Sequence, residues 1–423
     1  MRGRIWIAGL LALFLLLSGC ASGEAHSSED EAISASSDPE TPQITSAADL
    51  PRGTAPTKAL LAAAQAQPEG LWGYLAPDGS WAIEPAFLSA DSFSEGLAVV
   101  ETEGEYHESV FGYIDQTGSY SGNLHPWFTG AWKFSDGLAR VTDNSSDYFY
   151  INRKAELAFP QRILQNDAGN YYEAFVNAFN FATDFCGGYA LVAEENPYTG
   201  KTQFAVISDM GELVLQLDPK YCEGEMHAVA GSAPDENGYC IVGVENGGSV
   251  LYGVLNLQGE TVLPLEYDEI YPFAEGCFAA RKAGLWGFVD ADGQTVLPFQ
   301  FEGARPFSGT AAPVKQDGNW GIVDREGKWL REPEFASVSE AGFSEGLLAV
   351  SDGEGWGYLD VRGMTIVPPV LAAAGDFSEG LAWFSDANGR FGYLNTQGEV
   401  VIEPEFSAAS DFCSAEIPPE NKE

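Results

Sequence analysis

The sequence predicts an all-β fold, a tandem array of about nine three-stranded antiparallel meander repeats, on three observations. An aromatic residue followed by glycine recurs at nearly constant spacing along most of the chain. Short β-branched and aliphatic runs stand at matching places in each repeat. A turn sequence ending in glycine separates two of these runs in every clear copy. A fixed period of this kind identifies a repeat architecture before any local assignment of secondary structure.

The first element along the chain is an export signal. Arg2 and Arg4 precede an apolar run from Ile5 to Leu17, which is too short to span a hydrocarbon core of about 30 Å as a stable helix. The residues Leu17-Ser18-Gly19-Cys20 resemble the lipobox of bacterial lipoproteins. The resemblance implies a signal peptide over residues 1–20 that ends at lipidated Cys20. The acyl chains would hold the protein at the cell membrane or the outer membrane, outside the cytoplasm. An ordinary secretory signal with a chance cysteine is the alternative.

Residues 21–58 are rich in Ser, Ala, Glu, Asp, Thr and Pro and contain no aromatic residue. Such a segment cannot bury enough apolar surface to offset its ordering entropy, so we expect a flexible tether before a repeat domain at 59–423. The whole chain has 62 acidic and 21 basic residues and a net charge of −41, which excludes an electrostatic grip on nucleic acid. Attraction to cations or basic partners remains an alternative to a simple role in solubility.

Nine aromatic positions divide the repeat domain into units beginning near residues 72, 111, 149, 204, 252, 286, 320, 356 and 391. The steps between them are 39, 38, 55, 48, 34, 34, 36 and 35 residues. Seven units have the aromatic-glycine pair: Trp72-Gly73, Phe111-Gly112, Tyr252-Gly253, Trp286-Gly287, Trp320-Gly321, Trp356-Gly357 and Phe391-Gly392. Two degenerate copies are Phe149-Tyr150 and Phe204-Ala205.

The residue pattern of each unit predicts three short strands. The aromatic-glycine run is followed by a turn such as Asp290 to Gly293, then by a second apolar run ending at a proline such as Pro298, where ladder pairing must stop. A Phe-Ser-Glu-Gly-Leu segment, as at Phe93 or Phe377, then precedes a third run. This arrangement resembles the WG-repeat family, also called KWG repeats, over about 350 of the 423 residues. Units three and four depart from the pattern.

A meander of this size cannot bury its apolar face alone, so neighbouring units must stack. The aromatic before glycine and the phenylalanine before Ser-Glu-Gly are the candidates for the core between units. Propellers typically have four to eight blades of four strands, and both numbers differ from this pattern. The first unit also lacks a recognisable strand before Trp72. We therefore expect an open superhelical array, with closure into a β-propeller as the alternative.

No catalytic string is present, and only four histidines are available as bases. Asp290-Ala291-Asp292-Gly293 has the start of a calcium loop, but other units keep its glycine and lose its carboxylates, so a turn is expected. The cysteines form no CxxC pair, which argues against zinc, and a bridge between Cys222 and Cys240 stays open. We expect no catalytic residue, no metal and no cofactor.

Additions to units three and four are candidates for a binding face. Tyr171, Tyr172 and Phe175 have the spacing of one face of a short helix, and Trp127 and Trp132 are unusual for their positions in unit two. Packing of that helix on the sheet is the alternative. The expected function is a membrane-anchored binding or protein-interaction module. Its partner would be a protein or a cell-envelope glycan. A cell-surface glycan-binding protein or glycan hydrolase, and an inert spacer, are the alternatives.

Overall fold

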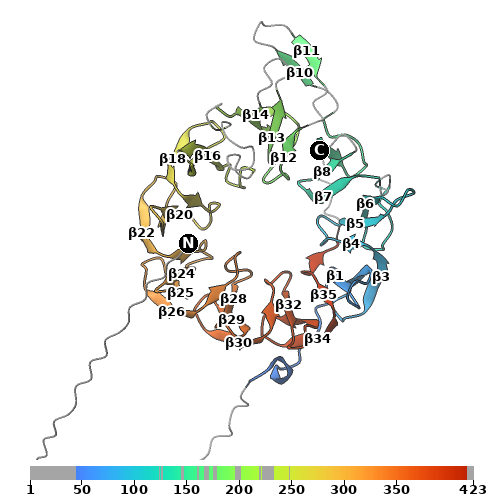
Figure 1. Cartoon of the computed structure of the whole chain (residues 1–423), viewed down its shortest axis with the longest axis vertical. Helices are drawn as coiled ribbons and strands as arrows, with labels where there is room; N and C mark the ends of the chain where they lie inside the picture. Colours follow the sequence, from blue (N-terminus) through green and yellow to red (C-terminus); the bar gives the residue numbers. More distant parts are fainter. Residues whose placement is uncertain are drawn as a thin grey trace, which may run out of the picture. The chain divides into compact units, whose positions relative to one another are not determined.

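The computed structural model describes residues 44–416 apart from 123, 125–126, 144–146, 160–161, 166–170, 175–178, 196–201, 219–220, 222–232 and 247. Cys20 and the expected signal peptide lie outside the described residues. Within this part, small antiparallel sheets are arranged as blades around a ring (Figure 1). It contains the 3-10 turn η1 (Ala47–Asp49), and no described helix is long and apolar enough to cross a bilayer.

The described part contains nine blades, which we number along the chain. Blade 1 is β1–β3 with β35 and β36, blade 2 is β4–β6, blade 3 is β7–β9, blade 4 is β12–β15, blade 5 is β16–β18, blade 6 is β19–β22, blade 7 is β23–β26, blade 8 is β27–β30 and blade 9 is β31–β34. A complete blade has four strands, and Figure 1 places the last of them, such as β22, β30 or β34, at the outer rim.

The strands fall into four classes. The short first strands are β4 (Ser89–Ala90), β12 (Phe181–Ala182), β19 (Glu269–Ile270), β23 (Gly303–Ala304), β27 (Ser337–Val338), β31 (Ala373–Ala374) and β35 (Ala408–Ala409), and a longer one is β7 (Gly130–Ser135). The second strands are β1 (Leu60–Gln65), β5 (Ala98–Glu103), β8 (Leu138–Thr142), β13 (Tyr189–Glu195), β16 (Cys240–Asn246), β20 (Phe278–Lys282), β24 (Ala312–Gln316), β28 (Leu347–Ser351) and β32 (Leu381–Ser385).

The third strands carry the aromatic-glycine position: β2 (Trp72–Leu75), β6 (Ser109–Ile114), β9 (Tyr148–Asn152), β14 (Thr202–Ser208), β17 (Ser249–Leu255), β21 (Leu285–Val289), β25 (Asn319–Val323), β29 (Trp356–Asp360) and β33 (Phe391–Asn395). The outer strands are β3 (Trp81–Phe87), β15 (Leu213–Gln216), β18 (Thr261–Tyr267), β22 (Thr295–Phe301), β26 (Trp329–Phe335), β30 (Thr365–Leu371) and β34 (Val400–Phe406). A complete sequence unit thus gives two strands to one blade and two to the next, so the expected three-stranded meander is corrected to a four-stranded blade shared between units.

In six described outer strands, β3, β18, β22, β26, β30 and β34, the proline lies inside the strand, not at its end as expected. In blade 6 the pairing runs Phe288 to Leu297 and then Trp286 to Phe301, so the outer strand bulges at Pro298. A bulge leaves backbone groups unpaired, which is why a residue without an N–H is tolerated there. The strand therefore continues past the proline to pack Phe301 against Trp286.

The ring is closed, so the expectation of an open array was wrong and the propeller alternative holds. The C-terminal segments β35 and β36 (Cys413–Ser414) both pair with β1, with Ala409 opposite Ala64 and Cys413 opposite Leu61. The C-terminus thus supplies the first strand of blade 1, next to β1. β1 is the strand that the first unit was expected to lack.

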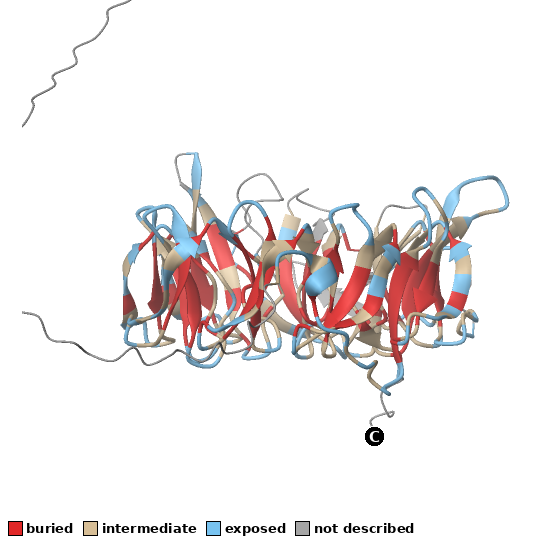
Figure 2. Cartoon of the chain, turned by 90° about the horizontal axis from the view of Figure 1, so that it is seen from below, coloured by how far each residue is buried: buried red, intermediate tan, exposed pale blue. Residues whose placement is uncertain are grey.

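The packing confirms closure independently of strand pairing. Nine hydrophobic clusters lie between successive blades. One of them joins Leu60 and Leu75 of blade 1 to Tyr393 and Ile402 of blade 9. Figure 2 shows the buried residues along the strands and the exposed residues in the turns on both faces.

Residues 44–53, assigned above to the tether, instead lie on the ring as a segment that we call the strap. Leu50 is buried in the cluster between blades 8 and 9, with Ile44 and Ala47 against it. Arg52 forms a parallel bridge with Val400 at the start of β34. The described end of the expected tether is therefore part of the folded domain.

The addition to unit three is a hairpin, so the expected helix was wrong. β10 (Arg162–Gln165) pairs with β11 (Tyr171–Ala174), and Figure 1 shows this hairpin standing out from the ring. The spacing of aromatic residues over so few positions does not distinguish a strand from a helix. Phe175 lies outside the described residues.

Candidate functional site

The glycine of each aromatic-glycine pair sits where the outer strand crosses closely. At Gly73, Gly287 and Gly321, a Cβ atom would stand 2.6, 2.9 and 2.6 Å from a backbone oxygen of the outer strand. Gly253, Gly357 and Gly392 meet their outer strands in the same way. Because those contacts are with backbone, a side chain could not be accommodated by a rotamer change. The glycines are therefore part of the blade architecture.

The aromatic residue before glycine packs on the face of its blade. Trp286 and Trp320 are 5% and 8% exposed, and Trp320 lies over Gly303 with the Arg305 guanidinium 5.0 Å from its ring centre. The other five are half-buried: Trp72, Phe111, Tyr252, Trp356 and Phe391. In four units the deepest ring is the tyrosine that follows the glycine, which the sequence pattern did not single out: Tyr74, Tyr113, Tyr358 and Tyr393.

These tyrosines form the seam between blades. Tyr358 packs edge-on against Phe377 at 5.0 Å between ring centres, and its hydroxyl donates to the Gly375 carbonyl at 2.7 Å. Tyr393 repeats the arrangement with Phe412 and the Ser410 carbonyl, at 4.6 and 2.8 Å. Burial raises the pKa of both phenols. The phenylalanine before Ser-Glu-Gly, a candidate for this core, is therefore paired mainly with tyrosine instead of tryptophan.

The Ser-Glu-Gly segment is a hairpin turn that forms hydrogen bonds to the next blade. Glu345 and Gly346 have φ of 50° and 77°, as a type I′ turn requires. The Ser344 hydroxyl donates to the Phe377 carbonyl at 2.6 Å, and the Glu345 carboxylate accepts from the Gly380 N–H at 2.8 Å. The recurring acid of this motif therefore has a structural role.

The residues expected to form an aromatic patch are only partly described, and the two described tryptophans differ in exposure. Trp127 is 56% exposed and stacks on Phe128, whereas Trp132 is half-buried with the Arg140 guanidinium 4.2 Å from its ring centre. Tyr171 and Tyr172 lie on β11, whose side chains are outside the described part. Trp127 alone of the described members presents a large exposed face.

The turn at Asp290 to Gly293 has the geometry expected of a turn. The Asp290 carboxylate accepts the backbone N–H groups of Asp292 and Gln294 at 3.0 and 2.7 Å. Asn256 and Asn395 make the same bonds in other blades. The amide oxygen of asparagine accepts the same hydrogen bonds, so the turn forms without a carboxylate and does not require a bound cation.

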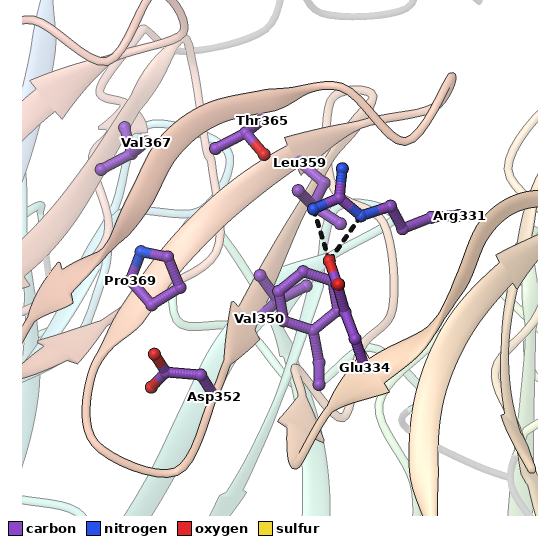
Figure 3. Close-up of a pocket in the computed structure, with 9 residues that line it drawn as sticks. Arg331, Glu334, Val350, Asp352, Leu359, Thr365, Val367 and Pro369 are labelled. Atoms are coloured by element: carbon purple, nitrogen blue, oxygen red, sulfur yellow. Dashed lines mark hydrogen bonds and ion pairs between the residues drawn. The ribbon is translucent and has the colours of Figure 1, made fainter. Parts of the chain in front are cut away.

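A cavity of about 260 Å³ opens between blades 7 and 8 (Figure 3). Both apolar and charged side chains face it: Arg331, Glu334 and Phe335 from β26, and Val350, Asp352, Leu359, Thr365, Val367 and Pro369 from blade 8. Its volume is slightly below the roughly 300–1,000 Å³ of pockets for drug-sized ligands, so it suits a side chain or a small group. We call it the inter-blade pocket.

One residue differs at the interface where the pocket lies. On each of the six outer strands that contain a proline, one residue pairs with the residue that follows the motif glycine. In five other blades this outer-strand residue is aliphatic: Ile83, Leu263, Leu297, Val367 and Ile402. In blade 7 the same position is Arg331, which pairs with Ile322. Its guanidinium binds Glu334, with 2.6 Å between Nε and Oε1 (Figure 3), and also donates to the Gly363 carbonyl of blade 8 at 3.4 Å. Val367, the equivalent residue of blade 8, is instead buried in the hydrophobic cluster between blades 8 and 9.

The mouth of the pocket is acidic and partly apolar. Asp352 accepts the N–H groups of Glu354 and Gly355 at 2.9 Å, and these bonds lower the pKa of its carboxyl group. In the described part of the chain it forms no ion pair. Leu330 and Met364, each next to a lining residue in the chain, are 37% and 58% exposed. The pocket therefore combines an apolar interior with a carboxylate that backbone N–H groups hold in its charged form.

Comparisons with known proteins agree with the repeat pattern and the fold. A family model described as WG containing repeat matches residues 72–106, 252–286, 286–320, 320–355, 356–389 and 391–415. A crystal structure described as the eukaryotic initiation factor is similar in fold, with a TM-score of 0.52 and 10% identity over 86% of this chain and 99% of that one. BamB from Moraxella catarrhalis aligns with 11% identity over 73% of this chain and 93% of its own, at a TM-score of 0.38. No curated protein matches the chain.

Proposed function

This chain belongs to the WG-repeat family, and from its ring of nine blades we propose that it is a binding or protein-interaction module of the bacterial cell envelope. In this proposal Cys20 carries the lipid that holds the chain outside the cytoplasm. The inter-blade pocket is the surface that meets the partner. The observation that carries the proposal is the replacement of a recurring aliphatic residue by Arg331 at the interface where the pocket lies.

The chemistry of the pocket supports binding over hydrolysis. Retaining and inverting glycosidases need one carboxyl group with a raised pKa to act as general acid. Asp352 has the opposite shift, because backbone N–H groups stabilise its carboxylate, and Glu334 is held by Arg331. The Asp352 carboxyl group is therefore not suited to donate a proton at neutral pH.

A glycan-binding role is the second candidate, and Trp127 is the observation that favours it. Its ring is 56% exposed and lies 4.4 Å from the Phe128 ring, so one face can stack on a sugar. Binding of soluble cell-wall glycan fragments that is lost in Trp127→Ser and kept in Asp352→Asn would favour this role.

The interaction role is tested in the cell envelope with a photoreactive side chain. An amino acid with a benzophenone side chain, which crosslinks to neighbouring molecules under light, replaces Met364 next to the pocket. As the control, the same amino acid replaces Met210, which is 77% exposed in blade 4. We expect discrete protein adducts at position 364 that are absent at position 210. Identical adducts at the two positions would indicate an inert spacer. Turnover of cell-wall glycan that is lost in Asp352→Asn would indicate a hydrolase.

The anchor is tested separately. Cys20→Ala removes the thiol that receives the lipid, so we expect the protein to move from the membrane fraction to the soluble fraction. Retention of Cys20→Ala in the membrane fraction would contradict lipid anchoring at this residue.

A further inference from the structure

The strap shows how this fold holds an extended peptide. The Val400 N–H donates to the Pro51 carbonyl at 2.7 Å, and the Gly53 N–H donates to the Val400 carbonyl at 2.9 Å. The Leu50 side chain is 3% exposed between blades 8 and 9, and Arg52 pairs with Glu403. Backbone pairing to a strand edge, an aliphatic anchor and a basic residue with an acidic partner together hold the segment.

The inter-blade pocket is the same place one blade earlier in the ring. Val400 pairs with Leu394 in blade 9 as Thr365 pairs with Leu359 in blade 8. Five lining residues of the pocket correspond by this register to members of the cluster around Leu50: Arg331 to Val367, Phe335 to Leu371, Val350 to Phe384, Leu359 to Leu394 and Thr365 to Val400.

The backbone edge is also equivalent. β30 and β34 are each the last strand of their sheet. The strap pairs with the outer edge of β34 at Val400, and the equivalent backbone position on the outer edge of β30 is Thr365. An extended segment laid along Thr365 would place one side chain over the pocket, where the strap places Leu50. The strap itself is seated between blades 8 and 9, which leaves the pocket between blades 7 and 8 for another segment.

We propose that the inter-blade pocket is a docking groove for an extended segment of another protein that carries an aliphatic anchor with a basic residue beside it. This inference rests on the proposed function and names the class of partner. The anchor fills the pocket. The basic residue is drawn to Asp352, the lining carboxylate that forms no ion pair among the described residues, and to the net charge of −41.

The strap sequence supplies a defined probe. A fluorescent decapeptide Ile-Thr-Ser-Ala-Ala-Asp-Leu-Pro-Arg-Gly is titrated with the full chain, and binding is followed by anisotropy. We expect one saturable site per chain. A peptide with aspartate in place of leucine should lose binding, because a charge cannot enter the apolar interior.

Variants of the chain locate the site. Arg331→Leu fills the groove with the aliphatic residue found in other blades, and we expect it to weaken peptide binding at least about tenfold. Asp352→Asn should weaken binding about threefold, an effect that falls with added salt. Its matched control is Asp386→Asn, which changes the corresponding residue of blade 9 and should leave binding unchanged.

The outcomes separate the possible occupants. Equal binding by the wild-type chain and Arg331→Leu would mean that the peptide merely displaces the strap, and would overturn the proposal. A concentration-dependent dimer that Arg331→Leu abolishes would assign the groove to a second copy of this chain, and would also overturn it. Failure of the peptide experiment with adducts still formed at position 364 would leave the interaction role standing. Peptide binding without such adducts would instead remove that role.

Discussion

The Ser378 hydroxyl donates a hydrogen bond to the carbonyl oxygen of Phe412 at 2.7 Å, across the seam where the two ends of the repeat array meet. Ser344 makes the same bond to Phe377 at 2.6 Å, between blades 8 and 9. The contact that joins consecutive blades therefore also closes the ring. Closure reuses the ordinary interface, with the C-terminal segment in place of a further unit.

Loss of this bond should cost as much at the seam as elsewhere. Ser378→Ala and Ser344→Ala are each expected to lower the free energy of unfolding by about 1 kcal/mol, the typical net value of one hydrogen bond. Denaturant unfolding of the full chain measures both. A Ser378→Ala cost near zero beside a normal Ser344→Ala cost would mean that the seam is held more loosely than the other interfaces.

The repeat, the all-β class and the turn chemistry could be predicted because each rests on local residue patterns that recur. Closure could not, because its strands carry weak signals. Leu60–Gln65 contains three alanines, which have low strand propensity, although Ala62 to Ala64 are fully buried. Ala408–Ala409 is two residues long. The sequence pattern also could not show that a unit is divided between two blades.

The pocket left a signal in the sequence that a full comparison of the units would have found. Arg331 stands where other units have isoleucine, leucine or valine. The aromatic residues expected to form a binding patch share a residue type, but they differ in exposure. Trp132 lies beneath Arg140, while Trp127 is exposed. A departure from the repeat at a buried position was thus more informative than an aromatic residue at an unusual one.

Substitution of a motif glycine should destabilise the ring more than substitution of a turn glycine. In Gly321→Ala the new methyl group would stand 2.6 Å from the Arg331 carbonyl oxygen, so the two strands must separate. We expect a loss of about 1–3 kcal/mol, the usual cost of overpacking. The comparison is Gly318→Asn, at φ 82° with open space around it, where asparagine tolerates the backbone. Equal effects in thermal unfolding would contradict this account of the Trp-Gly pair.

Filling the pocket should stabilise the fold while removing the proposed docking groove. Arg331→Leu places an aliphatic side chain where Val367 and Ile402 stand in the next two blades. Burial of a leucine contributes about 1.5–3 kcal/mol, and loss of the partly exposed pair with Glu334 offsets a small part of it. We therefore expect a gain of about 1–2 kcal/mol by chemical denaturation. A net loss would show that the arginine itself supports the interface.

Asp411 should make the stability of the ring fall as pH rises. Burial raises the pKa of its carboxyl group, with a further contribution from the charge of Asp376, and its Oδ1 atom is buried without a hydrogen-bond partner. The folded chain therefore binds the proton more tightly than the unfolded chain does. Stability is greatest below the unfolded pKa and declines as pH rises from that value through the folded pKa.

Asp411→Asn removes this titration, so its advantage in Tm over the wild-type chain should be larger at pH 7 than at pH 4. Asp78→Asn is the control of opposite sign, because the hydroxyl and N–H of Ser80 lower the pKa of the exposed Asp78 carboxyl. That stabilisation is present above the unfolded pKa and is lost as pH falls, so any cost of Asp78→Asn should appear at pH 7. A Tm difference for Asp411→Asn that is the same at both pH values would mean that Asp411 is ionised at no cost in the folded ring.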